Sequence, residues 1–100
     1  MPVPSNIPAF SVVTEFQTDE KVTVKIQGFS SDDESSYYHA MINCEVVRYI
    51  CSDDACSFAG FEKFFDDSIP VVEGKLWSKG LSENQVEDLI IQLSDKFPNP

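Results

Sequence analysis

Residues 10–27, FSVVTEFQTDEKVTVKIQ, set the fold class of this chain. On both sides of a polar connector at 17–20, apolar and polar side chains alternate with a period of two, which is the pattern of half-buried β-strands. The connector is of hairpin length, so the two strands are expected to be antiparallel neighbours. Their predicted apolar faces are formed by Phe10, Val12, Thr14, Phe16, Val22, Val24 and Ile26.

Of the two segments that flank this hairpin, only the one that follows it is expected to add a strand to the sheet. Residues 28–36, GFSSDDESS, are polar without apolar periodicity and are expected to form a loop. Residues 37–51 are rich in β-branched and aromatic residues, so they predict a third strand, with a bend because fifteen residues is long for one strand. Its predicted apolar face includes Tyr38, Ala40, Ile42, Cys44, Val46 and Ile50. Residues 1–9 contain three prolines and are expected to form an extended arm.

A helical period begins in the second half of the chain. Within residues 52–67, four phenylalanines (58, 61, 64 and 65) have the spacing of one helix face, which favours a core stripe over a partner anchor. Ser52 or one of the two aspartates after it is a candidate N-cap. Pro70 is expected to end this helix, and residues 71–77 are predicted to form a short fourth strand.

The last element has the clearest sequence signature. Ser82 and Gln85 have the spacing of a capping box, and apolar residues follow at helical spacing from Val86 to Phe97. Strands followed by helices indicate an α+β domain. We therefore expect a small antiparallel sheet of three to four strands, with two helices packed on one face, as a single compact domain over residues 10–100.

Charge is the feature that bears on function. The chain has 17 acidic and 7 basic side chains in 100 residues, a formal charge of −10. This exceeds the magnitude of about 2–8 that is enough to keep a small domain soluble. A surface of this kind repels nucleic acid and anionic lipid and attracts cationic partners. With 12% aromatic residues the chain is also unlike a disordered acidic tail.

The candidate chemical groups do not match a known catalytic or metal-binding pattern. His39, Cys44, Cys51 and Cys56 are potential zinc ligands, but they lack the close Cys-x2-Cys pair typical of structural zinc sites. The lone His39 has no nucleophile motif beside it, and a glycine-rich phosphate loop is absent. We therefore expect neither enzymatic activity nor a cofactor or metal.

The expected function is that of an acidic protein-binding inhibitor or antidote, which blocks a basic surface of a nuclease or another nucleic-acid-binding protein. Carboxylates can occupy sites that bind phosphates, because arginine and lysine pair with both groups. In composition the chain is similar to small phage anti-restriction or anti-CRISPR proteins and to immunity proteins. The predicted partner-binding residues are Asp32, Asp33, Glu34, Tyr37, Tyr38, Asp53, Asp54, Asp66, Asp67 and Trp77.

The alternative is a small structural or adaptor subunit whose acidity serves only solubility. In both cases we expect a cytoplasmic protein, because its three cysteines are an odd, sparse set and its amino end lacks the apolar run of a signal peptide. Because of its negative charge, we expect it to bind neither nucleic acid nor membrane directly.

Overall fold

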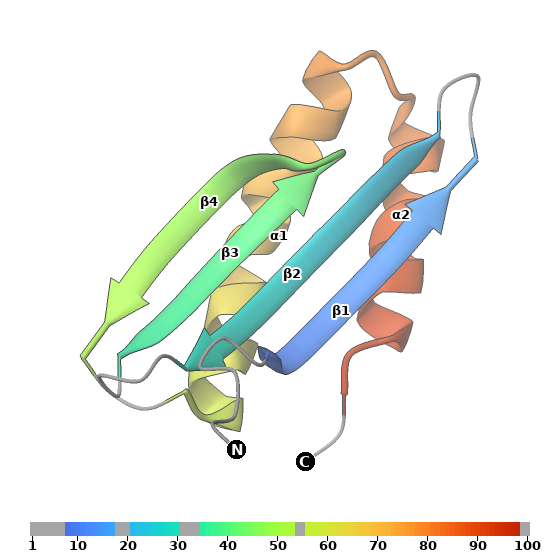
Figure 1. The fold of residues 1–100 in the computed structure, drawn as a ribbon. Helices are drawn as coiled ribbons and strands as arrows, with labels where there is room; N and C mark the ends of the chain where they lie inside the picture. The colour runs from blue at the N-terminus through green and yellow to red at the C-terminus, as the bar shows by residue number, and fades with distance from the viewer. Residues whose placement is uncertain (1–7, 18–20, 31–34, 54–55, 99–100) are drawn as a thin grey trace.

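A computed structural model describes residues 8–17, 21–30, 35–53 and 56–98. Four strands form one antiparallel sheet in the order β1-β2-β3-β4: β1 (Pro8–Phe16), β2 (Val22–Ser30), β3 (Ser36–Ile42) and β4 (Glu45–Ser52). Two helices follow, α1 (Phe58–Ser78) and α2 (Glu83–Asp95). Both helices cover the same face of the sheet and leave the other face open (Figure 1). The predicted α+β class, with an antiparallel sheet and two helices on one face, is confirmed.

The first hairpin forms as its alternating pattern predicts. Val12, Val24 and Ile26 point to the helices and are at most 1% exposed. Val12 lies opposite Ile26, and Thr14 lies opposite Val24. β1 begins at Pro8, so the strand starts two residues before the predicted domain boundary. Residues 1–7, the greater part of the predicted arm, lie outside the described residues.

The segment 37–51 contains a hairpin rather than one bent strand. Asn43 and Cys44 have φ values of 51° and 71°, which reverse the chain in a two-residue turn with two left-handed positions. The side chain of Asn43 fixes the turn by accepting a hydrogen bond from the Thr23 amide at 2.9 Å. As a result Cys44 is exposed in the turn, and the prediction that it shares the buried face of Ala40 and Ile42 is wrong.

A β-bulge places one charged side chain under α1. The register of β3 with β4 shifts between Ala40 and Met41, so that Arg48 lies opposite Ala40 on the helix side of the sheet. Its guanidinium donates to the Ser68 hydroxyl at 3.1 Å and lies 4.6 Å from the centre of the Phe64 ring. An inward-pointing charge and a bulge are both features that protect an edge strand from pairing with another chain.

The first helix continues past Pro70, the residue at which it was expected to end. It begins at Phe58 with Ser57 as N-cap, whose hydroxyl accepts from the Gly60 amide at 3.1 Å, and it continues past Pro70 to Ser78. Pro70 is exposed, while buried side chains lie on one face on both sides of it: Phe61, Phe64, Phe65, Ser68, Val72 and Leu76. The predicted N-cap at residues 52–54 and the predicted strand at 71–77 are therefore wrong. Of the predicted phenylalanine stripe, Phe61, Phe64 and Phe65 are core as predicted, whereas Phe58 is only half-buried.

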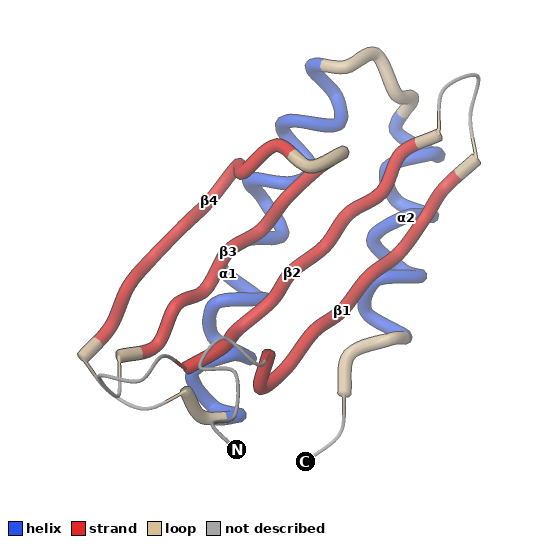
Figure 2. The backbone as a smooth tube through the Cα atoms, in the orientation of Figure 1, coloured by secondary structure: helices blue, strands red, loops and turns tan. Residues whose placement is uncertain are grey.

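The second helix agrees closely with its prediction. Ser82 accepts from the Gln85 amide at 3.2 Å, and the Gln85 side chain accepts from the Ser82 amide at 2.8 Å, which completes the capping box. Val86, Leu89 and Leu93 are at most 1% exposed. α2 packs behind β1, and α1 packs behind β3 and β4 (Figure 2).

The core contains one polar group whose removal is expected to raise stability. Thr14 is 0% exposed, and its hydroxyl has no hydrogen-bond partner among the described residues. An unsatisfied buried hydroxyl costs about 1–3 kcal/mol, so Thr14→Val, which keeps the shape, is expected to raise the free energy of unfolding by about 1 kcal/mol. Urea denaturation measures the change, with Thr23→Val on the half-buried outer side of β2 as control. A loss of stability for Thr14→Val would show that the hydroxyl is satisfied in solution.

Candidate functional site

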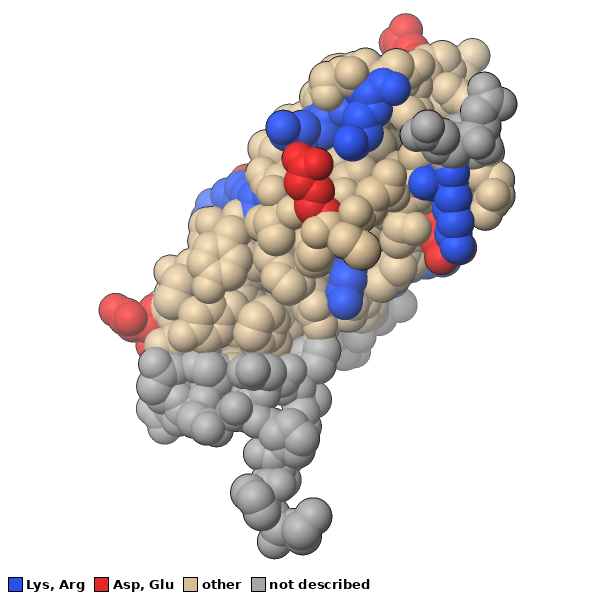
Figure 3. Space-filling model, turned by 45° about the horizontal axis from the view of Figure 1, so that its top comes forward, with Lys and Arg blue, Asp and Glu red and all other residues tan. Residues whose placement is uncertain are grey.

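The charged side chains of the described residues are distributed unevenly between the sheet and the helical layer. From residue 8 to residue 53 the described acidic residues are Glu15, Glu45 and Asp53, which are balanced by Lys21, Lys25 and Arg48. From residue 56 to residue 98 there are eight carboxylates and four lysines, a net charge of −4. The described residues on the sheet side are accordingly mostly uncharged, with isolated charged side chains of both signs (Figure 3). The described negative potential is therefore centred on the helices.

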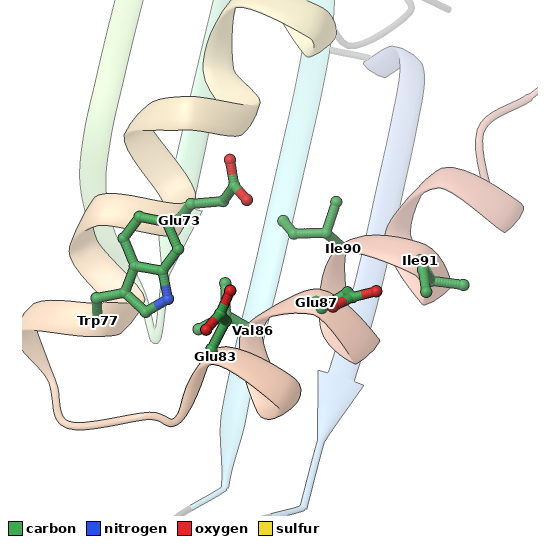
Figure 4. A pocket seen from close by; sticks show the side chains of 7 residues that line it. All are labelled: Glu73, Trp77, Glu83, Val86, Glu87, Ile90 and Ile91. Carbon is green, nitrogen blue, oxygen red and sulfur yellow. The ribbon is translucent and has the colours of Figure 1, made fainter.

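The outer surfaces of α1 and α2 enclose a groove of about 340 Å³. Glu73, Trp77, Glu83, Val86, Glu87, Ile90 and Ile91 line it. Trp77 and Ile91 are 50% and 51% exposed, while Val86 is buried and Ile90 half-buried. The three charged side chains of the lining are all glutamates, so the groove combines an apolar floor with an acidic rim (Figure 4).

The connection between the helices explains why these side chains meet. Gly80 has φ +95° and donates to the Trp77 carbonyl at 3.0 Å, while Leu81 donates to the Leu76 carbonyl at 3.3 Å. These two bonds form a Schellman motif, which ends α1 in a tight left-handed turn. Ser82 then caps α2, so Trp77 in the last turn of α1 lies beside Glu83 in the first turn of α2 (Figure 4).

Helical spacing supplies the rest of the groove. Glu83, Glu87 and Ile91 follow one another at intervals of four residues on α2, and Glu73 and Trp77 have the same interval on α1. Residues four apart on a helix lie on one face. This spacing indicates the helix faces that line the groove. It was not recognised on α1, because residues 71–77 were wrongly predicted to form a strand.

The predicted partner-binding residues that the structure describes are distributed over β3, the end of β4 and α1. Trp77 is exposed as expected and lies in the groove. Asp66 and Asp67 are exposed on α1, where Asp67 pairs with Lys63 at 3.2 Å. Asp53 is exposed directly after β4. The other predicted carboxylates, Asp32, Asp33, Glu34 and Asp54, lie outside the described residues.

Tyr38 belongs to the core and corrects the prediction that it is a surface anchor. It is 5% exposed and stacks on Phe64 with ring centres 5.4 Å apart. Its hydroxyl is hydrogen-bonded to Cys56, and burial raises the pKa of both Tyr38 and the Cys56 thiol. The thiol is therefore more strongly held in its protonated form than an exposed cysteine.

Tyr37 lies on the opposite, open face of the sheet, in an aromatic cluster. Its ring stacks on Phe29 at 5.4 Å and lies 6.3 Å from the ring of Tyr49. Tyr49 is 53% exposed. An open antiparallel face is usually polar, so this aromatic surface is the second candidate interface of the molecule.

His39 lies in the same cluster, and its pKa is lower than that of an exposed histidine. Burial and, to a smaller extent, Lys25 lower its pKa below the ordinary 6.5, while its Nε2 lies 2.9 Å from the Gln27 side-chain oxygen. The unfolded chain therefore binds a proton at His39 more readily than the folded chain does. The resulting contribution of His39 to the free energy of unfolding is fully present above pH 6.5 and is lost as the pH falls through the folded pKa. NMR titration of this lone histidine measures the value, and Lys25→Gln should raise it. A folded pKa at or above 6.5 would contradict this account.

Comparisons with known proteins do not supply an identity: neither a family model nor a curated protein nor a solved structure matches the chain. Among the described residues, the helices are too short or too polar to cross a membrane.

Proposed function

We propose that this protein is a non-enzymatic, cytoplasmic binding protein that blocks a basic surface of a partner protein through its helical layer. The partner would be a nuclease or another nucleic-acid-binding protein, and the role would be that of an anti-defence inhibitor or an immunity protein. The observation that supports this proposal is the excess of carboxylates on α1 and α2, next to strands without net charge.

A rigid acidic layer suits such a role for a physical reason. The backbone of a helix that is packed against a sheet has a fixed position, so the sites from which its carboxylates project can be matched to the arginines and lysines of a phosphate-binding surface. Opposite potentials also accelerate encounter, and salt screens this effect over about 8–10 Å. A layer of this kind therefore gives fast, salt-sensitive association.

A second candidate function is that of an adaptor subunit, and one observation favours it. The aromatic cluster of Phe29, Tyr37, His39 and Tyr49 occupies the open face of the sheet, away from the acidic helices. Binding through this face would be largely apolar and would depend little on salt.

The dependence of binding on ionic strength separates the two functions. A partner is captured from cell extract at low salt, identified and purified, and its association rate is then measured at about 50 mM and about 500 mM salt. The inhibitor proposal predicts a fall of at least about tenfold, because steering by charge is lost. A rate that changes by less than about twofold would reject it and support the adaptor, whose affinity should instead fall on Tyr49→Ser.

A further inference from the structure

The groove between α1 and α2 has a chemistry that is more specific than negative charge alone. Trp77 is 50% exposed, and it lines the groove together with carboxylates from both helices (Figure 4). The volume of about 340 Å³ is at the small end of ligand cavities, which span about 300–1,000 Å³. The groove thus has room for one or two side chains of a larger partner.

Three kinds of occupant can be compared by their chemistry. An anionic group would face three glutamates without a cation among the lining residues. A purely apolar group would remove water from these carboxylates without replacing their hydrogen bonds. A cationic side chain with an apolar stem satisfies both parts of the groove, because the stem packs on the floor while the charge reaches the rim.

Arginine fits this arrangement better than lysine. Its planar guanidinium stacks on an indole and at the same time donates in-plane hydrogen bonds to carboxylates on either side. In Figure 4 Glu73 and Glu83 both lie close to the indole of Trp77, one from each helix. The ammonium of lysine is strongly hydrated and has no flat face to stack.

We propose that the groove between α1 and α2 receives an arginine side chain from the basic surface of the partner protein, with its guanidinium stacked on Trp77 between Glu73 and Glu83. This inference rests on the proposed function and identifies the contact through which the helical layer would recognise its partner. Ile90 and Val86 would pack against the methylene groups of the arginine.

The lone tryptophan of the chain makes the proposal testable without knowledge of the partner. The probe is a blocked, alanine-based helical peptide with arginines at every fourth position, and Trp77 fluorescence and the NMR signal of its indole N–H report binding. Matched peptides carry lysine or the neutral isostere citrulline. We expect the arginine peptide to bind at least about threefold more tightly than the lysine peptide, from stacking, and more than about tenfold more tightly than the citrulline peptide.

Variants with equal net charge locate the binding site. The triple substitution Glu73→Gln, Glu83→Gln and Glu87→Gln should weaken the arginine peptide by more than about tenfold. The control Glu62→Gln, Asp66→Asn and Asp95→Asn removes the same charge outside the groove and should weaken it by less than about threefold. Trp77→Leu removes the reporter, so its binding is followed by the backbone amide NMR signals of α1 and α2; it should abolish the preference for arginine over lysine. Circular dichroism confirms that each variant is folded.

Two results would overturn the inference: equal losses for the two triple variants, or binding of the citrulline peptide as tight as that of the arginine peptide. Either could occur while the purified partner still associates in a salt-sensitive way, in which case the proposed function stands and only this contact is wrong. Conversely, an arginine peptide that occupies the groove, together with salt-independent binding of the partner, would reject the proposed function and leave the arginine site intact.

Discussion

Replacing Phe64 by alanine is expected to lower the free energy of unfolding by about 3–5 kcal/mol, because truncating a buried phenylalanine removes its transfer free energy and leaves a cavity. Phe64 is 2% exposed and lies between the ring of Tyr38, at 5.4 Å, and the guanidinium of Arg48, at 4.6 Å. The substitution would therefore loosen the contact of α1 with both β3 and β4. A domain of this size has about 5–15 kcal/mol of stability in total, so the loss is severe.

Urea denaturation followed by circular dichroism measures this change. Val71→Ala on the same helix serves as control, since Val71 is 36% exposed and alanine is the better helix former. We expect the control to remain within about 0.5 kcal/mol of the parent chain. A loss below about 1 kcal/mol for Phe64→Ala would mean that α1 does not pack on the sheet as described.

Replacing Gly60 by alanine is expected to destabilise the protein by about 1–3 kcal/mol, although alanine normally stabilises a helix by about 1 kcal/mol relative to glycine. A Cβ at position 60 would lie 2.6 Å from the Tyr38 hydroxyl oxygen. The hydroxyl cannot move freely, because Tyr38 is buried and the group is hydrogen-bonded to Cys56, Ser36 and the Ser57 backbone. Steric conflict therefore outweighs helix propensity at this position.

Two further variants separate the steric effect from the propensity. At Gly74, also inside α1, a Cβ would meet no atom within 4 Å, so Gly74→Ala should raise stability by about 0.5–1 kcal/mol. In the Tyr38→Phe background the oxygen is gone, and the cost of Gly60→Ala should largely disappear. An unchanged cost in that background would show that the strain lies elsewhere, for example at the Ser57 N-cap.

The parts of the fold that the sequence predicts are those where local pattern and tertiary packing agree. The hairpin of β1 and β2 follows from strict alternation, and α2 follows from its capping box and apolar spacing. Burial of one face reinforces the local preference in both elements, so the same residues satisfy both requirements.

The errors arise where packing overrides a local preference. A proline inside a helix costs about 3 kcal/mol, which suggests a helix end at Pro70. Ser68 and Val72, on either side of Pro70, are buried in the core, and this packing offsets the cost of the proline. At Asn43–Cys44 a cysteine adopts φ 71°, a conformation for which the sequence lacks the usual glycine, so the turn was not recognised.

The candidate site was predictable only in part. The acidity of the chain and the exposure of Trp77 could be inferred from composition and flanking residues. The four-residue spacing indicated the two helix faces that line the groove, but not that they meet, because this depends on α1 continuing to Ser78 and on the Schellman turn at Gly80. Tyr38 was wrongly predicted as a surface anchor, although the alternation of this strand had already placed it on the apolar face with Ala40 and Ile42, where the structure buries it.

The central claim is that the helical layer, rather than the sheet, is the binding face, and charge reversal on each layer tests it most directly. The helical variant Glu62→Lys, Asp66→Lys and Asp88→Lys changes the net charge by as much as the sheet variant Glu15→Lys, Glu45→Lys and Asp53→Lys. The association rate of the purified partner with each variant is the measurement. We expect a fall of at least about tenfold for the helical variant and less than about threefold for the sheet variant. Equal effects of the two variants, or a larger effect of the sheet variant, would contradict the claim.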